Sequence, residues 1–181
     1  MKLSTLSIVL GLVVVLVQLY ALMKPKEFIA SARKFPRSLP WGYLLMAIGT
    51  AGFLVYLRRE SIADFEKYKP VMMAVFGAIA IAVCIYVSDF LAVRGLAISM
   101  LVLAKLMTDT GRPRLGDTSW ALLIQVWAYV FIVLGIWWTV SPWRCRDLIQ
   151  WATSTEQRHK SLSFIRLAFG ALVVVLGVTV F

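Results

Sequence analysis

Residues 71–107 read VMMAVFGAIAIAVCIYVSDFLAVRGLAISMLVLAKLM, an apolar stretch interrupted near its middle by polar side chains. Its 37 residues exceed one crossing, because a bilayer core about 30 Å thick takes roughly 20 helical residues. The interruption contains Ser88, Asp89, Arg94 and Gly95. The stretch therefore predicts a tight hairpin of two helices, over 71–87 and 91–107.

Four further apolar runs of similar length flank this hairpin, over residues 3–23, 41–57, 120–140 and 162–181. Prolines and charged residues end most of them, as expected where a membrane span stops. The first run is long enough to span and has no small-residue cleavage site directly after it, so it predicts a retained helix. We therefore expect an all-α fold, a polytopic transmembrane helical bundle of about six spans.

The composition excludes most classes of soluble protein. Of the 181 residues, 61% are hydrophobic and only 15% are charged, and the mean hydropathy is +0.83. The 19 Lys and Arg outnumber the 9 Asp and Glu, but they lie in short clusters between the apolar runs. Such clusters are typical of contact with lipid headgroups, so we expect membrane lipids as partners and no nucleic acid.

Two basic segments, 24–40 and 144–160, follow the first and fifth spans. Their apolar residues fall at helical spacing, which predicts short amphipathic helices in the headgroup layer: Phe28, Ile29, Ala32 and Phe35 in the first, and Leu148, Trp151 and Ala152 in the second. The shared order of span, proline stop, basic segment and span divides the chain into hairpins 1–57 and 120–181 around a central segment 58–119. Duplication and chance similarity both remain open.

The C-terminal hairpin resembles a family of very short bacterial inner-membrane proteins of unknown function, in which a proline-started basic linker joins two helices. The resemblance rests on Pro142, the linker after it, and Arg166, Gly170 and Gly177 of the last span. The first hairpin departs from it, because no arginine opens its second span. The resemblance implies topology and a bacterial inner membrane rather than an activity.

Orientation follows from the distribution of basic residues. With both amphipathic linkers and the turn of the central hairpin in the cytoplasm, 11 Lys and Arg lie inside, counting Arg94 and Arg166, and 8 lie outside. The positive-inside tendency therefore favours cytoplasmic linkers and two periplasmic termini.

Residues 105–113 contain Lys105, six further residues, and then Arg112-Pro113. This spacing resembles the first signature of membrane phosphatidate phosphatases, where the lysine and arginine hold a phosphate. That family also needs two histidines from later motifs, for nucleophilic and acid–base roles. The chain has a single histidine, His159, so we interpret the match as loop basicity and predict no catalytic residues.

His159 itself lies in the second basic linker, and we expect it to be solvated. No second ligand type stands at metal spacing, so we predict no metal, haem or other cofactor. Cys84 and Cys145 are far apart in sequence and predicted depth, so we expect no disulfide. Cys145 has Arg144 and Arg146 as neighbours, which would lower the pKa of a thiol, but isolated cysteines of this kind are usually inert.

Four polar residues fall within or beside spans: Gln18, Asp89, Arg94 and Gln125. Ionisable groups at membrane depth often mark ion paths. For Asp89 and Arg94, near the hairpin turn, we favour a salt bridge or an interfacial anchor. The two glutamines are expected to bond across helices.

Small residues recur at spacings that let helices approach closely, namely Ala74, Ala78 and Ala82, Gly95 and Ser99, and Gly170 and Gly177. Such faces promote helix association in lipid, within a chain or with a partner. The tryptophans near span ends indicate interfacial anchors rather than pigment or quinone pockets: Trp41, Trp120, Trp137, Trp138 and Trp143.

These features favour a non-catalytic structural or accessory subunit of a larger bacterial membrane complex, with other membrane subunits as partners. One alternative is a small transporter or channel lined by Gln18, Asp89, Arg94 and Gln125. A lipid phosphate phosphatase-like enzyme is a remote alternative.

Overall fold

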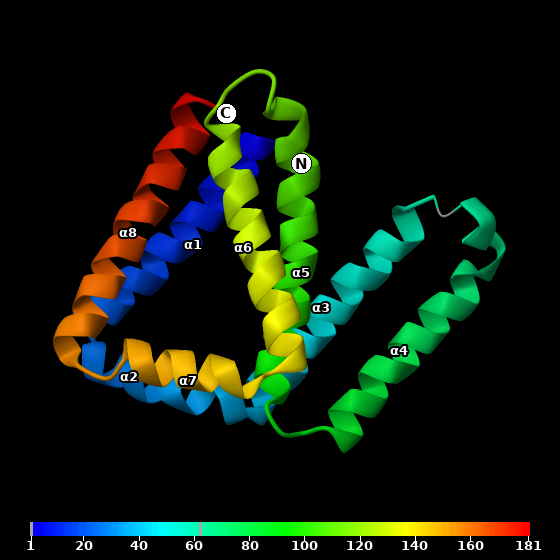
Figure 1. Cartoon of the computed structure of the whole chain (residues 1–181), viewed down its shortest axis with the longest axis horizontal. Coiled ribbons are helices and arrows are strands. Elements are labelled where there is room, and N and C mark those ends of the chain that lie inside the picture. Colours follow the sequence, from blue (N-terminus) through cyan, green and yellow to red (C-terminus); the bar gives the residue numbers. More distant parts are fainter. Residues whose placement is uncertain (1, 62) are drawn as a thin grey trace. The chain divides into compact units, whose positions relative to one another are not determined.

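The computed structural model describes residues 2–61 and 63–181, with the side chains of 63–65 left out. Within these residues the chain forms eight α-helices, three short 3-10 helices and no strand. Figure 1 shows their order along the chain. The all-α expectation is confirmed.

Six of the α-helices are long and apolar enough to cross a membrane, as predicted. They are α1 (Leu3–Met23), α3 (Leu39–Arg59), α4 (Lys69–Tyr86), α5 (Leu91–Gly111), α6 (Ala121–Val140) and α8 (Glu156–Thr179). Prolines occupy the first turns of α3 and α4, where a missing N–H costs nothing.

The long apolar stretch 71–107 is two helices and not one rod. Helix α4 ends at Tyr86, and α5 begins at Leu91. Between them Phe90 adopts a left-handed backbone conformation, with φ of 55°. A phenylalanine rarely adopts this conformation unless packing holds it there, and Phe90 is indeed buried with the guanidinium of Arg37 5.6 Å from its ring centre.

The two basic segments contain ten-residue helices, α2 (Pro25–Lys34) and α7 (Trp143–Ala152). The second segment ends earlier than predicted, because α8 begins at Glu156 instead of near residue 162. Thr155 caps this helix by accepting a hydrogen bond from the Arg158 N–H at 3.2 Å. The residues after Glu156 therefore belong to a long helix rather than to a linker.

Packing divides the chain into two compact units that combine distant segments. The first unit comprises Met1–Lys34, Ala104–Val130 and Arg146–Phe181, and the second comprises Phe35–Leu103 and Phe131–Cys145. The division of the sequence into 1–57, 58–119 and 120–181 stays a prediction about chain order.

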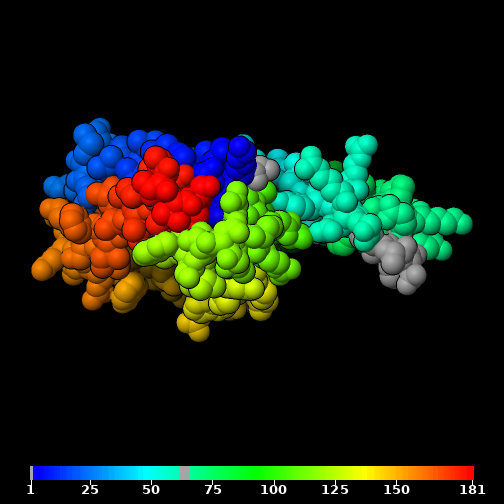
Figure 2. All heavy atoms as spheres, turned by 90° about the horizontal axis from the view of Figure 1, so that it is seen from above, coloured from blue at the N-terminus to red at the C-terminus, as the bar shows by residue number. Residues whose placement is uncertain are grey.

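The first unit is built around the antiparallel pair of α1 and α8, which pack against each other and adjoin at the face seen in Figure 2, where α1 is blue and α8 orange to red. A Cβ added at Gly11 would lie 2.9 Å from the carbonyl oxygen of Gly170, and one added at Gly177 would lie 3.2 Å from that of Ser4. Glycine is needed at this crossing because the backbones approach too closely for any side chain.

In the second unit α3 packs against both α4 and α5. A Cβ at Gly95 of α5 would lie 2.7 Å from the backbone nitrogen of Met46, so α5 lies backbone to backbone on α3. The Ser99 hydroxyl strengthens this contact by donating to the Leu45 carbonyl at 3.1 Å. On α4, Phe76 meets Phe53 edge to face with ring centres 5.1 Å apart.

Candidate functional site

No group of three or more His, Cys, Asp or Glu side chains that could hold a metal ion occurs among the described residues. Cys84 and Cys145 are both free thiols in these residues. Cys145, in α7, is buried, and burial raises the pKa of its thiol to about 11. Its arginine neighbours in sequence do not offset this burial, so Cys145 is held as an inert thiol at neutral pH.

The expectation of a solvated His159 is wrong. His159 lies in the first turns of α8 and is only 4% exposed. Its ring stacks on Phe28 of α2, with centres 5.5 Å apart and planes 30° apart. Its Nε2 lies 3.3 Å from the carbonyl oxygen of Ala21 in α1. Because a carbonyl only accepts, Nε2 carries a proton in this contact.

Pro25 explains why Ala21 needs this donor. In an α-helix the carbonyl of Ala21 would accept from the residue four positions on, but that residue is Pro25 and has no N–H. His159 supplies the missing hydrogen bond at the end of α1. One histidine therefore joins the last turn of α1, the face of α2 and the start of α8.

A second hydrogen-bonded contact joins α2 to the end of α7 within the first unit. Arg33 donates from Nε to the Thr153 hydroxyl at 3.0 Å and from Nη2 to the Thr153 carbonyl at 2.7 Å. Thr153 follows the last residue of α7, where helix carbonyls lack partners. The arginine thus satisfies an orphan acceptor and places positive charge at the negative end of the helix dipole.

The two span glutamines have different surroundings. Gln125 of α6 donates to the Thr108 carbonyl of α5 at 3.2 Å, as expected for a bond across helices. Gln18 is buried on α1, but its Oε1 has no hydrogen-bond partner among the described residues, and the same holds for the Ser7 hydroxyl. Both orphan groups lie on α1, the helix paired with α8.

Asp89 and Arg94 are not brought together. Asp89 is exposed in the turn before α5, and Arg94 is half-buried in the first turns of that helix. No ion pair joins them among the described residues, and the Arg94 Nε is buried without an acceptor. This arrangement argues against the predicted salt bridge and leaves the interfacial-anchor interpretation of the two charges.

The predicted small-residue faces fall into two groups. Gly95 and Ser99 lie against α3, and Gly170 and Gly177 lie against α1. Ala74, Ala78 and Ala82 are exposed on α4, and a Cβ added at Gly77 of the same helix would meet nothing within 4 Å. Helix α4 contains no buried residue at all.

The tryptophans also differ in their surroundings. Trp41, Trp120, Trp137 and Trp143 are between 43% and 53% exposed, which suits interfacial anchors. The Nε1 of Trp138 is buried without a partner in the described part of the chain. Trp120 has a further role, because it lines the groove described next.

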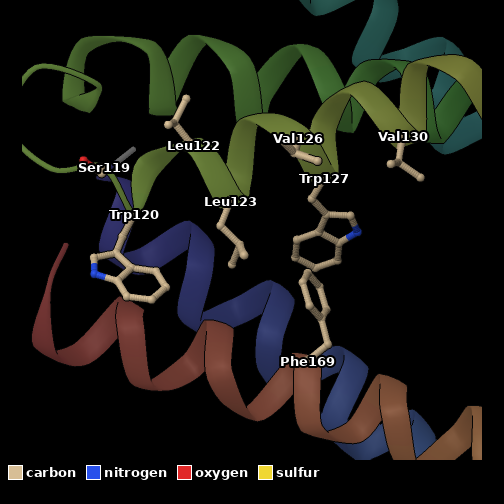
Figure 3. A pocket seen from close by; sticks show the side chains of 8 residues that line it. All are labelled: Ser119, Trp120, Leu122, Leu123, Val126, Trp127, Val130 and Phe169. Carbon is tan, nitrogen blue, oxygen red and sulfur yellow. The ribbon is translucent and has the colours of Figure 1, made fainter.

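An apolar groove with a cavity volume of about 400 Å³ lies between α6 and α8 in the first unit. Figure 3 shows Leu123 and Trp127 of α6, and Trp120 just before this helix, pointing toward α8, with Phe169 pointing back. The rings of Trp127 and Phe169 meet at right angles, 5.1 Å apart. Besides these four residues the groove is lined by Ser119, Leu122, Val126 and Val130.

Neither this groove nor the His159 contact was predicted from the sequence, since both depend on which helices pair. One signal was present for the histidine, because Pro25 leaves a carbonyl of the first span without its donor.

The fold defines an all-helical protein with six helices of membrane-spanning length and composition. No family model, no curated protein and no solved structure matches the chain.

Proposed function

We propose that this protein is a non-catalytic accessory subunit of a larger complex in a bacterial inner membrane, and that α4 binds another membrane protein. The observation that supports this is the packing of α4. Among the described residues α4 packs mainly against α3, and none of its residues is buried.

Exposure of apolar side chains alone would not require a partner, because lipid tails solvate them well. Small residues are different, since they let a second backbone approach closely and gain van der Waals contact that lipid does not provide. Ala74, Ala78 and Ala82 form such a face, at the four-residue spacing that aligns side chains along one side of a helix.

The membrane placement is part of this proposal. Helices α2 and α7 lie in the headgroup layer of the cytoplasmic leaflet, held by their basic residues, and the two termini lie on the periplasmic side. No catalytic residue and no cofactor is assigned. The transporter alternative gains no support, because none of Gln18, Asp89, Arg94 and Gln125 lines the groove.

The test is native mass spectrometry of the complex extracted in mild detergent. Wild type is expected to carry a second membrane protein in fixed stoichiometry. The double variant Ala74→Leu, Ala78→Leu is expected to lose it, because two bulky side chains would hold the partner helix away.

Ala171→Leu is the matched control, since Ala171 is also exposed on a long helix, α8. This variant is expected to keep the partner. Extraction of the wild type as a monomer, or retention of the partner by the double variant, would overturn the proposal.

A further inference from the structure

The groove between α6 and α8 begins at Ser119 and Trp120, at the start of α6, and runs to Val130. Ten helical residues rise by about 15 Å, so the groove is long and narrow for its 400 Å³. An α-helix is about 10 Å across, so ten residues of one would fill roughly 1,000 Å³. The dimensions suit a single hydrocarbon chain, whereas a partner helix would lie mostly outside the groove.

The segment that leads into the groove carries a cation without a counterion. Between residues 105 and 119, Lys105 pairs with Asp109 at 3.0 Å and Arg114 pairs with Asp117 at 3.2 Å. Arg112 is exposed and has no ion pair within the described chain. The segment thus keeps one net positive charge for an external anion.

Consecutive backbone turns connect Arg112 to the start of the groove, and in the first of them the Leu115 N–H donates to the Arg112 carbonyl at 3.3 Å. The Thr118 N–H donates to the Arg114 carbonyl at 3.2 Å, and the Ala121 N–H donates to the Thr118 carbonyl at 3.2 Å. The exposed pair of Arg114 and Asp117 contributes only about 0–1 kcal/mol, so Arg114 can exchange its partner for a phosphate.

We propose that this groove binds one acyl chain of an anionic phospholipid, whose phosphate lies at Arg112 and Arg114. The acyl chain enters beside Trp120 and passes Leu123 to reach the ring pair of Trp127 and Phe169. This inference rests on the proposed insertion into a membrane, but not on the docking role of α4.

The full chain, stripped of lipid in detergent, is titrated with palmitoyl-oleoyl phosphatidylglycerol and with the matching phosphatidylcholine, and binding is read by native mass spectrometry. Wild type is expected to bind one phosphatidylglycerol about fivefold more tightly than phosphatidylcholine, the factor expected for one arginine near an anionic headgroup.

Val126→Trp fills the groove and is expected to reduce the binding of both lipids by at least about fivefold. Val140→Trp is the matched control, because Val140 is also exposed on α6 but lies at its other end. Wild-type lipid affinity in Val126→Trp would overturn the proposal. A wild-type homodimer that this variant dissociates would also overturn it, because the groove would then hold a second copy of the protein.

Arg112→Gln tests the headgroup separately and does not depend on the folding of Val126→Trp. It is expected to lower phosphatidylglycerol binding to the level of phosphatidylcholine, whose headgroup carries the same phosphate but no net charge. Arg58→Gln removes an exposed charge at the end of α3 and is expected to keep the preference. Equal affinity of wild type for the two lipids would overturn the assignment of an anionic headgroup.

Discussion

The α1–α8 pair and helix α4 have similar apolar compositions but opposite packing. Gly11, Gly170 and Gly177 bring α1 and α8 to backbone contact, and the polar groups of Ser7, Gln18 and His159 are enclosed by the chain. Helix α4 also carries a glycine and a row of alanines, yet none of its residues is buried. Hydrophobicity therefore decides whether a helix enters the membrane, while small residues decide how closely helices meet.

The difference suggests two uses for small residues in one chain. Along α1 and α8 they close an internal contact that brings the two ends of the chain together. Along α4 the same kind of face remains available to another molecule.

The largest expected effect on stability comes from adding one methyl group at a glycine of the α1–α8 contact. In Gly11→Ala the new Cβ would lie 2.9 Å from the Gly170 carbonyl oxygen and 3.0 Å from the Val174 nitrogen. Neither backbone atom can move without separating the helices, so we expect a loss of roughly 1–3 kcal/mol in unfolding free energy.

Gly77→Ala is the matched change on α4, where a new Cβ meets nothing within 4 Å. It should leave stability unchanged or raise it by up to about 1 kcal/mol through helix propensity. Reversible unfolding in mixed micelles measures both variants. Equal destabilisation by the two would erase the contrast between the regions.

The next effect concerns the corner where α1, α2 and α8 meet. His159→Ala removes the donor to the Ala21 carbonyl and is expected to cost about 1–3 kcal/mol, because a buried acceptor is left unpaired. Pro25→Ala restores a backbone N–H four residues after Ala21. A double-mutant cycle should therefore show a smaller cost of His159→Ala in the Pro25→Ala background. Strict additivity would show that the histidine acts by stacking alone.

At neutral pH the smallest effect on stability is expected at Cys145, where the main prediction concerns reactivity. Burial raises the pKa of its thiol to about 11, so the reactive thiolate is scarce at pH 8 and increases about tenfold per pH unit below that pKa. In a Cys84→Ala background, alkylation should be slow in the folded protein and fast after denaturation. Because the folded-state pKa lies above that of the unfolded chain, the fold should lose stability as pH rises between about 9 and 11. Rapid labelling at neutral pH in the folded state would contradict the burial of this residue.

Much of the fold could be predicted from the sequence, because run length and proline stops determine where a helix can cross lipid. The start of α8 was missed because residues 156–160 were interpreted as the end of the basic linker 144–160. Thr155 followed by Glu156 was a usable start signal, since this pair supplies an N-cap and an acidic first turn.

The candidate site was less predictable for a physical reason. A span that is apolar on every side does not reveal which side meets another helix. The burial of His159 and the contact of Phe169 with Trp127 both require the pairing of helices distant in sequence. The face at Ala74, Ala78 and Ala82 was recognised, but the sequence does not distinguish an internal contact from an external one.

Photo-crosslinking in native membranes tests the central claim about α4 most directly. A benzophenone amino acid replaces Ala78 in one variant and Ala171 in the other, both exposed positions on long helices. The account predicts a discrete product between this chain and a different membrane protein from position 78, and only lipid adducts from position 171. Lipid adducts alone from both positions, or a product containing only two copies of this chain, would contradict it.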